Sequence, residues 1–265
     1  MANIVHGTRN TYSLSNDSRS ESLCDGIAKR LFKNIKGYQD HQFSEKPGHE
    51  FICDFKLWLQ TLQSKRLGRK KAIGQVLSMF NQTFWNEGIS ACKDKSSLRL
   101  YGAVHDDDCI YLVISSVDLK KPHRTSIAMM GIGLTKHVLS RVLFRLKPAD
   151  LMWDLKCLTS TITELIRVCH NKSDAKLWVI LPDIGGFVVE TFFVDSTEQF
   201  YGKIITFVDQ GLLSRKQISL GLIQWKRYEL ANPISCRSSL GYINDLKSRD
   251  ATGRTNLTNV MISNR

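Results

Sequence analysis

Three residues suited to phosphate chemistry recur at intervals of four within residues 135–147, namely His137, Arg141 and Arg145. On a helix this spacing places them in one row along the edge of an apolar stripe of five Val and Leu residues. A histidine titrates near neutral pH and can take or give a proton. Arginines hold phosphate oxygens with paired hydrogen bonds and offset charge that develops on phosphorus. The row is therefore suited to phosphodiester cleavage, although arginines commonly line helix edges and a single histidine commonly has a structural role.

This helix is followed by a second helical stretch, a hairpin and a strand that contains Thr206. The segment 134–209 thereby resembles the metal-independent toxin ribonucleases of the barnase/RelE-like superfamily. The resemblance implies that His137, Arg141, Arg145 and Thr206 gather on one face of a sheet and cleave RNA through its 2′-hydroxyl, without metal or cofactor. The second arginine is followed by Leu-Lys, where the family usually has Arg-Gly.

A second basic feature lies between two predicted helices, within the segment Ser64-Lys-Arg-Leu-Gly-Arg-Lys-Lys71. Its cations are Lys65, Arg66, Arg69, Lys70 and Lys71. Cations this close repel one another, and their mutual repulsion falls when a polyanion binds. The segment predicts contact with nucleic-acid phosphates, and a solvated basic loop is the alternative.

Two groups of carboxylates resemble metal ligands. The run from His105 to Asp108 is typical of a solvated hairpin turn, because successive side chains of a strand point to opposite faces. Asp183 and Glu190 have the order of a nuclease motif, but Phe192 occupies the place of the lysine that would activate water. The cysteines show no zinc-module spacing. We expect no metal site.

The chain of 265 residues has 37 Lys and Arg against 25 Asp and Glu, a formal net charge of +12. Residues 1–95 hold 15 basic and 9 acidic residues and residues 96–265 hold 22 and 16, which is +6 in each part. A positive field of this kind attracts polyanions. We expect nucleic acid as the partner, RNA before DNA, with a protein inhibitor or complex partner as a further candidate and no membrane.

Seven scattered cysteines and the lack of an apolar leader indicate a reducing, cytoplasmic setting. Apolar periodicity divides the chain into a flexible N-terminus (1–17), a helical unit (18–95), an α+β domain (96–229) and a polar, loosely ordered tail (230–265). Strands are expected at 98–104, 109–117, 126–132, 177–181, 187–194 and 201–208, and helices at about 135–146, 151–166 and 214–228. Paired strands with two helices between the pairs predict an α+β fold with a mainly antiparallel sheet.

Three functions fit these patterns. The first is a metal-independent endoribonuclease of toxin or defence type that uses His137 as general acid or base. The second is a non-catalytic nucleic-acid-binding or regulatory protein that uses Lys65–Lys71 and the two helix arginines for phosphates. The third is a protein-interaction subunit whose charge keeps it in solution. Only the first function requires both His137 and Thr206.

Overall fold

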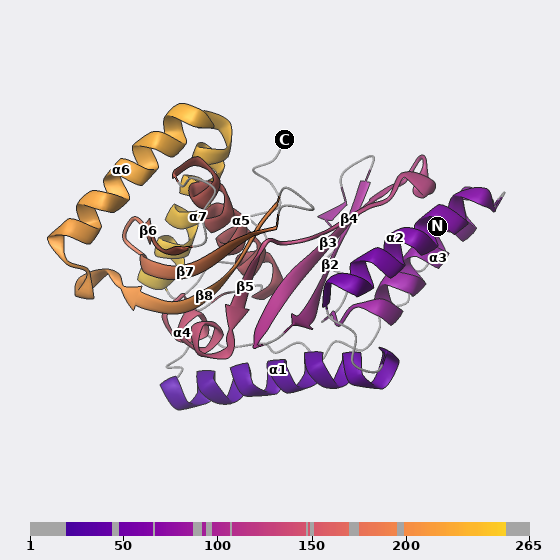
Figure 1. Ribbon diagram of the computed structural model, residues 1–265, viewed down its shortest axis with the longest axis horizontal. Helices are drawn as coiled ribbons and strands as arrows, with labels where there is room; N and C mark the ends of the chain where they lie inside the picture. The colour runs from indigo at the N-terminus through magenta and orange to yellow at the C-terminus, as the bar shows by residue number, and fades with distance from the viewer. Residues whose placement is uncertain are drawn as a thin grey trace.

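The computed structural model describes residues 20–43, 48–65, 67–86, 92–93, 97–106, 108–146, 148, 151–169, 175–194 and 199–252. The expected flexible N-terminus and Arg66 lie outside this part of the chain. The N-terminal half contains, in order, α1 (Glu21–Phe43), α2 (Gly48–Ser64), α3 (Arg69–Thr83), β1 (Cys92–Lys93), β2 (Ser97–Asp106), β3 (Cys109–Asp118), the 3₁₀ turn η1 (Pro122–Arg124), β4 (Ser126–Met129) and β5 (Ile132–Thr135). Next come α4 (Lys136–Leu146), α5 (Leu151–Cys169), β6 (Ala175–Leu181), β7 (Gly185–Val194), β8 (Gln199–Asp209), the 3₁₀ turn η2 (Gln210–Leu212), α6 (Arg215–Ala231) and α7 (Pro233–Thr252) (Figure 1).

The strands form one sheet in the order β1-β2-β3-β5-β8-β7-β6, and β4 also pairs with β3. Strands β5 and β8 run parallel, and the other pairs described are antiparallel. The helices α4 and α5 connect β5 to β6, so the hairpin β6–β7 and the strand β8 extend the sheet beyond β5. The predicted α+β fold with a mainly antiparallel sheet is confirmed.

Side chains of β2 and β3 alternate between two cores, one on each face of the sheet. Tyr101 and Ile110 belong to the core that contains α1, α4 and α5. Leu100 and Tyr111 belong to the core that contains α2 and α3. Helix α1 therefore packs on the opposite face of the sheet from α2 and α3. The expected division near residue 95 does not separate two cores.

Helix α7 corrects the prediction of a loosely ordered tail, which is wrong for residues 233–252. Cys236, Ser239, Ile243 and Leu246 are buried on one side of this helix. The Thr161 hydroxyl of α5 donates to the Ser239 hydroxyl at 3.1 Å. The small polar residues of this buried face hid the apolar periodicity from the sequence. Residues 253–265 lie outside the described part.

Helix α6 covers β6, an edge strand of the sheet. The amide of Gln224 donates to the carbonyl of Trp178 at 2.6 Å and accepts from the backbone N–H of Ile180 at 3.1 Å. The indole of Trp225 donates to the carbonyl of Ile180 at 2.8 Å. A Cβ atom at Gly221 would lie 2.7 Å from Ile180, so the close approach requires glycine. These bonds satisfy strand groups that would otherwise be open to another chain.

No helix within the described segments combines the length and the apolar composition needed to cross a membrane.

Candidate functional site

Helix α4 carries the predicted row of His137, Arg141 and Arg145. The Thr135 hydroxyl at the end of β5 accepts from the backbone N–H of Val138 at 3.4 Å, at the first turn of the helix. The opposite side of α4 is held in the core by its buried residues Val138, Leu139, Val142 and Leu143. His137 and Arg145 are exposed and Arg141 is half-buried. The row therefore lies along the edge of the buried stripe, as its spacing predicts.

Acidic residues of neighbouring elements face this row. Arg141 lies 3.7 Å from a carboxylate oxygen of Glu21 on α1. Arg145 lies 3.1 Å from a carboxylate oxygen of Asp209 at the end of β8. A hydrogen bond from Lys29 lowers the pKa of Asp25 on α1, and the nearby charge of His137 contributes to this lowering. Arg141 and Arg145 thus each have a carboxylate partner within the molecule.

Thr206 lies on the opposite face of the sheet from α4. It pairs with Val188, whereas Ile204 pairs with Val189, so Ile205 is an extra residue in β8. Ile204 and Phe207 both enter the core that contains α4. In a regular strand, residues three positions apart would face opposite sides of the sheet. Thr206, between them, is only partly buried and points away from that core. The structure therefore does not bring Thr206 together with His137, because the bulge turns Thr206 to the other face of the sheet.

On this second face, charged residues of adjacent strands form a row. Glu190 of β7 lies 3.8 Å from the ammonium of Lys176 and 3.6 Å from that of Lys203. Lys203 also lies 3.8 Å from a carboxylate oxygen of Asp108. The charge of Asp108 raises the pKa of Lys203, and Glu190 contributes to the rise. This row is an alternating chain of ion pairs with little free charge for a ligand.

Asp183 and Glu190, considered as metal ligands, do not converge, and Asp107 of the run 105–108 lies outside the described residues. Asp183, in the turn between β6 and β7, forms an ion pair with Lys247 of α7. Glu190 is paired with lysines on both sides, as described above. Across the described residues, no group of three or more His, Cys, Asp or Glu side chains is placed to hold a metal ion.

A group of exposed cations lies where α3 begins. Arg69, Lys70 and Lys71 occupy the first turn of α3, and all three are exposed. The N-cap residue Gly68 offers no side-chain cap, and the first turn has no acidic residue. Helix N-termini carry partial positive charge and free backbone N–H groups, so acidic residues usually stabilise them. Cations at this position raise the local potential, and a bound anion would stabilise the turn.

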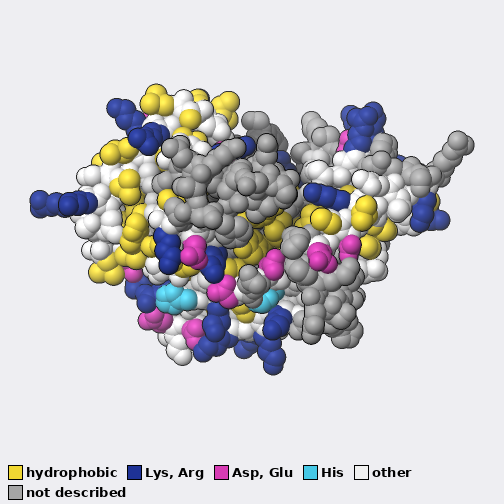
Figure 2. Space-filling view, in the orientation of Figure 1, with side chains coloured by type: hydrophobic (Ala, Val, Ile, Leu, Met, Phe, Trp, Pro, Cys, Tyr) yellow, Lys and Arg dark blue, Asp and Glu magenta, His cyan; other side chains and the backbone are white. Residues whose placement is uncertain are grey.

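A second group of cations lies beside this turn. The C-terminal end of α3 is fixed at the middle of β2, because Phe84, just after α3, lies against Gly102. The start of β2 pairs with Asp118, the last residue of β3. Since η1 follows Asp118 and contacts α2 and α3, the start of α3 points toward η1. The exposed cations at η1 are Lys120, Lys121 and Arg124. Dark blue side chains lie over this end of the molecule, at the right of Figure 2.

We call the described cations Lys65, Arg69, Lys70, Lys71, Lys120, Lys121 and Arg124 the basic end. None of the seven forms an ion pair within 4.0 Å in the described part of the chain. Asp118, the acidic residue beside η1, accepts from the backbone N–H groups of Lys120 at 2.7 Å and Lys121 at 2.9 Å. Hydrogen bonds from Lys121 and Lys120 lower the pKa of Asp118. The sequence prediction missed the η1 cations, although the run Lys-Lys-Pro-His-Arg (120–124) was a visible signal.

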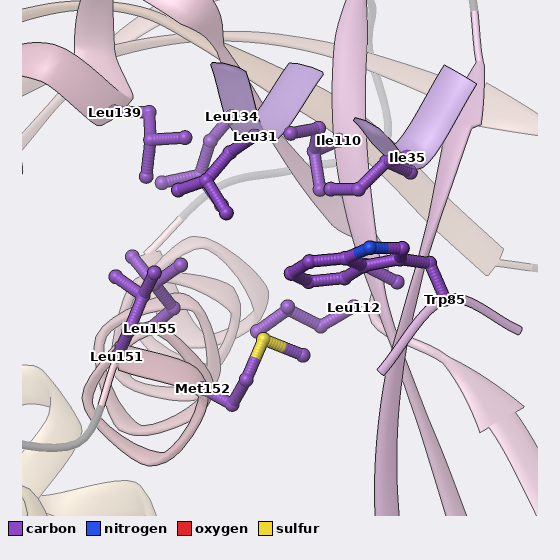
Figure 3. Close-up of a pocket in the computed structure, with 11 residues that line it drawn as sticks. Leu31, Ile35, Trp85, Ile110, Leu112, Leu134, Leu139, Leu151, Met152 and Leu155 are labelled. Atoms are coloured by element: carbon purple, nitrogen blue, oxygen red, sulfur yellow. The ribbon is translucent and has the colours of Figure 1, made fainter. Parts of the chain in front are cut away.

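A small apolar cavity lies in the core between α1, α5 and the sheet (Figure 3). Its volume is about 10 Å³, room for roughly one water-sized sphere. The side chains of Leu31, Trp85, Leu112 and Met152 are among those that enclose it, and all of its lining residues are apolar. This cavity is too small for a substrate.

No protein-family model, no curated protein and no solved structure matches the chain.

Proposed function

We propose that the protein is a non-catalytic nucleic-acid-binding protein that holds the phosphate backbone at the basic end. The observation that carries this proposal is the difference between two groups of cations. The arginines of α4 have carboxylate partners within 4.0 Å, whereas the seven cations of the basic end have none among the described residues. Unpaired cations release counterions when phosphates bind, which is the main source of affinity for nucleic acid.

The first turn of α3 adds directed donors to this charge. The backbone N–H groups of a helix N-terminus point toward an incoming anion, and Gly68 leaves them free of a side-chain cap. Lys70 and Lys71 are exposed beside them, and Arg124 extends the charge onto η1. Lysines and arginines on two elements can contact successive phosphates of one strand. Such contacts position a nucleic acid without reading its sequence.

The ribonuclease expected from the family resemblance has weaker support than binding. Its chemistry requires a general base and the phosphate-holding groups to surround the same atom. In the structure Thr206 lies on the other face of the sheet from His137, and Arg145 is paired with Asp209. We therefore propose binding in place of cleavage.

The test uses fluorescence anisotropy with an RNA of about 20 nucleotides, longer than most single-strand binding sites, and DNA of the same sequence. Replacing Arg69, Lys70 and Lys71 with Gln should weaken binding of both by about tenfold or more at low salt. The matched control replaces Arg30, Lys33 and Lys36, exposed on α1, and removes the same charge. Equal losses in both variants would show that net charge, and not the basic end, determines binding.

The same RNA, incubated with the protein in EDTA and in Mg²⁺ and then run on a denaturing gel, should remain intact. Cleavage in EDTA that disappears in His137→Ala would contradict the non-catalytic proposal and restore the ribonuclease.

A further inference from the structure

Exposed large apolar residues are concentrated around α6. Nine such residues are exposed in the described part of the chain, and seven of them lie between Leu212 and Ile234. The most exposed ones on α6 itself are Leu222 at 67% and Leu230 at 77%. Ile223 and Ile234 are also exposed, by 53% and 73%. Contiguous apolar surface of this kind marks sites of interaction in proteins.

Helix α6 carries large apolar side chains on its outer side as well as on its inner side. The inner side of α6 presents Gly221, Gln224, Trp225 and Tyr228. Gly221 lies against Ile180 of β6, Gln224 and Trp225 hydrogen-bond β6, and the Tyr228 hydroxyl bonds that of Ser239 on α7. The exposed residues Leu222, Ile223 and Leu230 lie on the outer side of the helix. A surface helix normally buries its apolar stripe. We call the residues Leu222, Ile223 and Leu230 the α6 patch; yellow side chains are visible over α6 at the upper left of Figure 2.

Charge within and around the α6 patch is almost entirely positive. Between residues 212 and 234 the basic residues are Arg215, Lys216, Lys226 and Arg227, and the one acidic residue is Glu229. Lys226 lies at three- or four-residue spacing from Leu222, Ile223 and Leu230, so it stands in the middle of the patch. It is exposed and forms no ion pair within 4.0 Å among the described residues.

We propose that the α6 patch docks a partner protein whose apolar surface carries Asp or Glu residues opposite Lys226. An apolar surface buries Leu222 and Leu230, and a carboxylate at its centre pairs with the ammonium that burial would otherwise leave unpaired. A second copy of this chain fits poorly, because two α6 patches facing each other bring eight cations against two carboxylates. A membrane surface fits less well than an acidic partner protein, because Lys226 lies at the centre of the face that would enter the lipid.

This proposal is independent of nucleic-acid binding. Helix α6 and the start of α3 lie at opposite ends of the molecule (Figure 1). A variant of the α6 patch should keep its RNA affinity, and a variant of the basic end should keep its protein contact. Failure of one proposal can therefore be distinguished from failure of the other.

The experiment selects a displayed library of random peptides on the purified full chain. Binders to a Leu222→Ser/Leu230→Ser variant are removed first. Recovered peptides should combine Leu, Ile, Phe or Trp with Asp or Glu. They should bind about tenfold or more weakly to Lys226→Glu, as expected for a central contact. The matched control is Leu57→Ser on α2, a leucine 58% exposed, which should leave peptide binding unchanged.

Three results would overturn the proposal. The first is that the recovered peptides lack acidic residues, or that no recovered peptide requires Leu222 and Leu230 for binding. The second is binding to vesicles of phosphatidylcholine and phosphatidylserine that the double variant loses. The third is a dimer in sedimentation velocity that the double variant abolishes. Unfolding curves of all variants should match wild type, because the changed side chains are exposed.

Discussion

Arg145 of α4 and Asp209 at the end of the interior strand β8 form an ion pair of 3.1 Å. Arg145 also lies over the ring of Phe144, 4.7 Å from its centre. In the predicted ribonuclease, Arg145 would have to be available to bind the phosphate of the substrate. Its two contacts give it a structural role, which is to tie the end of α4 to the strand that runs beside β5.

The pair should contribute modestly to stability. Both side chains are partly exposed, so a double-mutant cycle of Arg145→Met and Asp209→Asn should give a coupling free energy of about 0.2–1 kcal/mol in urea unfolding. RNA affinity of Arg145→Met should stay within about twofold of wild type, since the cation is already neutralised. A loss of affinity as large as that of the α3 variant would contradict the structural role.

Gln224 should be among the more costly polar residues to remove. It is buried and bonds two backbone groups of β6. Gln224→Leu leaves the N–H of Ile180 and the carbonyl of Trp178 without this partner, so we expect a loss of about 1–3 kcal/mol in the free energy of unfolding. Lys226→Gln, exposed on the same helix, should change it by less than about 0.5 kcal/mol. Similar effects in both variants would show that Gln224 does not hold α6 on the edge strand.

Two helical glycines should respond in opposite directions to alanine. Gly74 of α3 has open space at its Cβ position, so Gly74→Ala should stabilise the fold by about 0.5–1 kcal/mol through helix propensity. At Gly221 the new methyl would lie 2.7 Å from Ile180, and Gly221→Ala should destabilise by about 1–3 kcal/mol. Thermal unfolding of the two variants measures both signs. Stabilisation by Gly221→Ala would mean that α6 sits further from β6.

The stability of the η1 region should depend on pH through Asp118. Its folded pKa is lowered by hydrogen bonds from the N–H groups of Lys121 and Lys120. A lowered folded pKa stabilises the fold above the unfolded value of about 3.9, and this contribution is lost as the pH falls through the folded pKa. Asp118→Asn should therefore flatten the loss of stability below about pH 4. If the free energy of unfolding in urea falls equally steeply below about pH 4 in Asp118→Asn and in wild type, these hydrogen bonds do not stabilise the ionised Asp118.

Much of the fold followed from apolar periodicity. The strands and helices expected between residues 98 and 228 correspond to β2 to β8 and α4 to α6, except that the strand expected at 126–132 is divided into β4 and β5. Helix α7 was missed since its buried side includes Cys236 and Ser239. The facing of Thr206 could not be predicted because it depends on the one extra residue at Ile205.

The candidate site was predicted in part. The cations around Arg69 were identified from their density in the sequence, as was the row on α4. The ion pairs of Arg141 with Glu21 and Arg145 with Asp209 join residues far apart in the chain, and local patterns carry no information on them. The same holds for the meeting of η1 with α3. These long-range contacts decide which cations remain free.

The salt dependence of binding tests the basic end most directly. Wild type should bind RNA with log Kd changing linearly with log salt, at a slope of about 3–5 for four to six phosphate contacts. Replacing Arg69, Lys70 and Lys71 with Gln should lower that slope by about 2–3, whereas replacing Arg30, Lys33 and Lys36 should leave it within about 1 of wild type. A slope that the α3 variant leaves unchanged would contradict the assignment of the basic end as the nucleic-acid site.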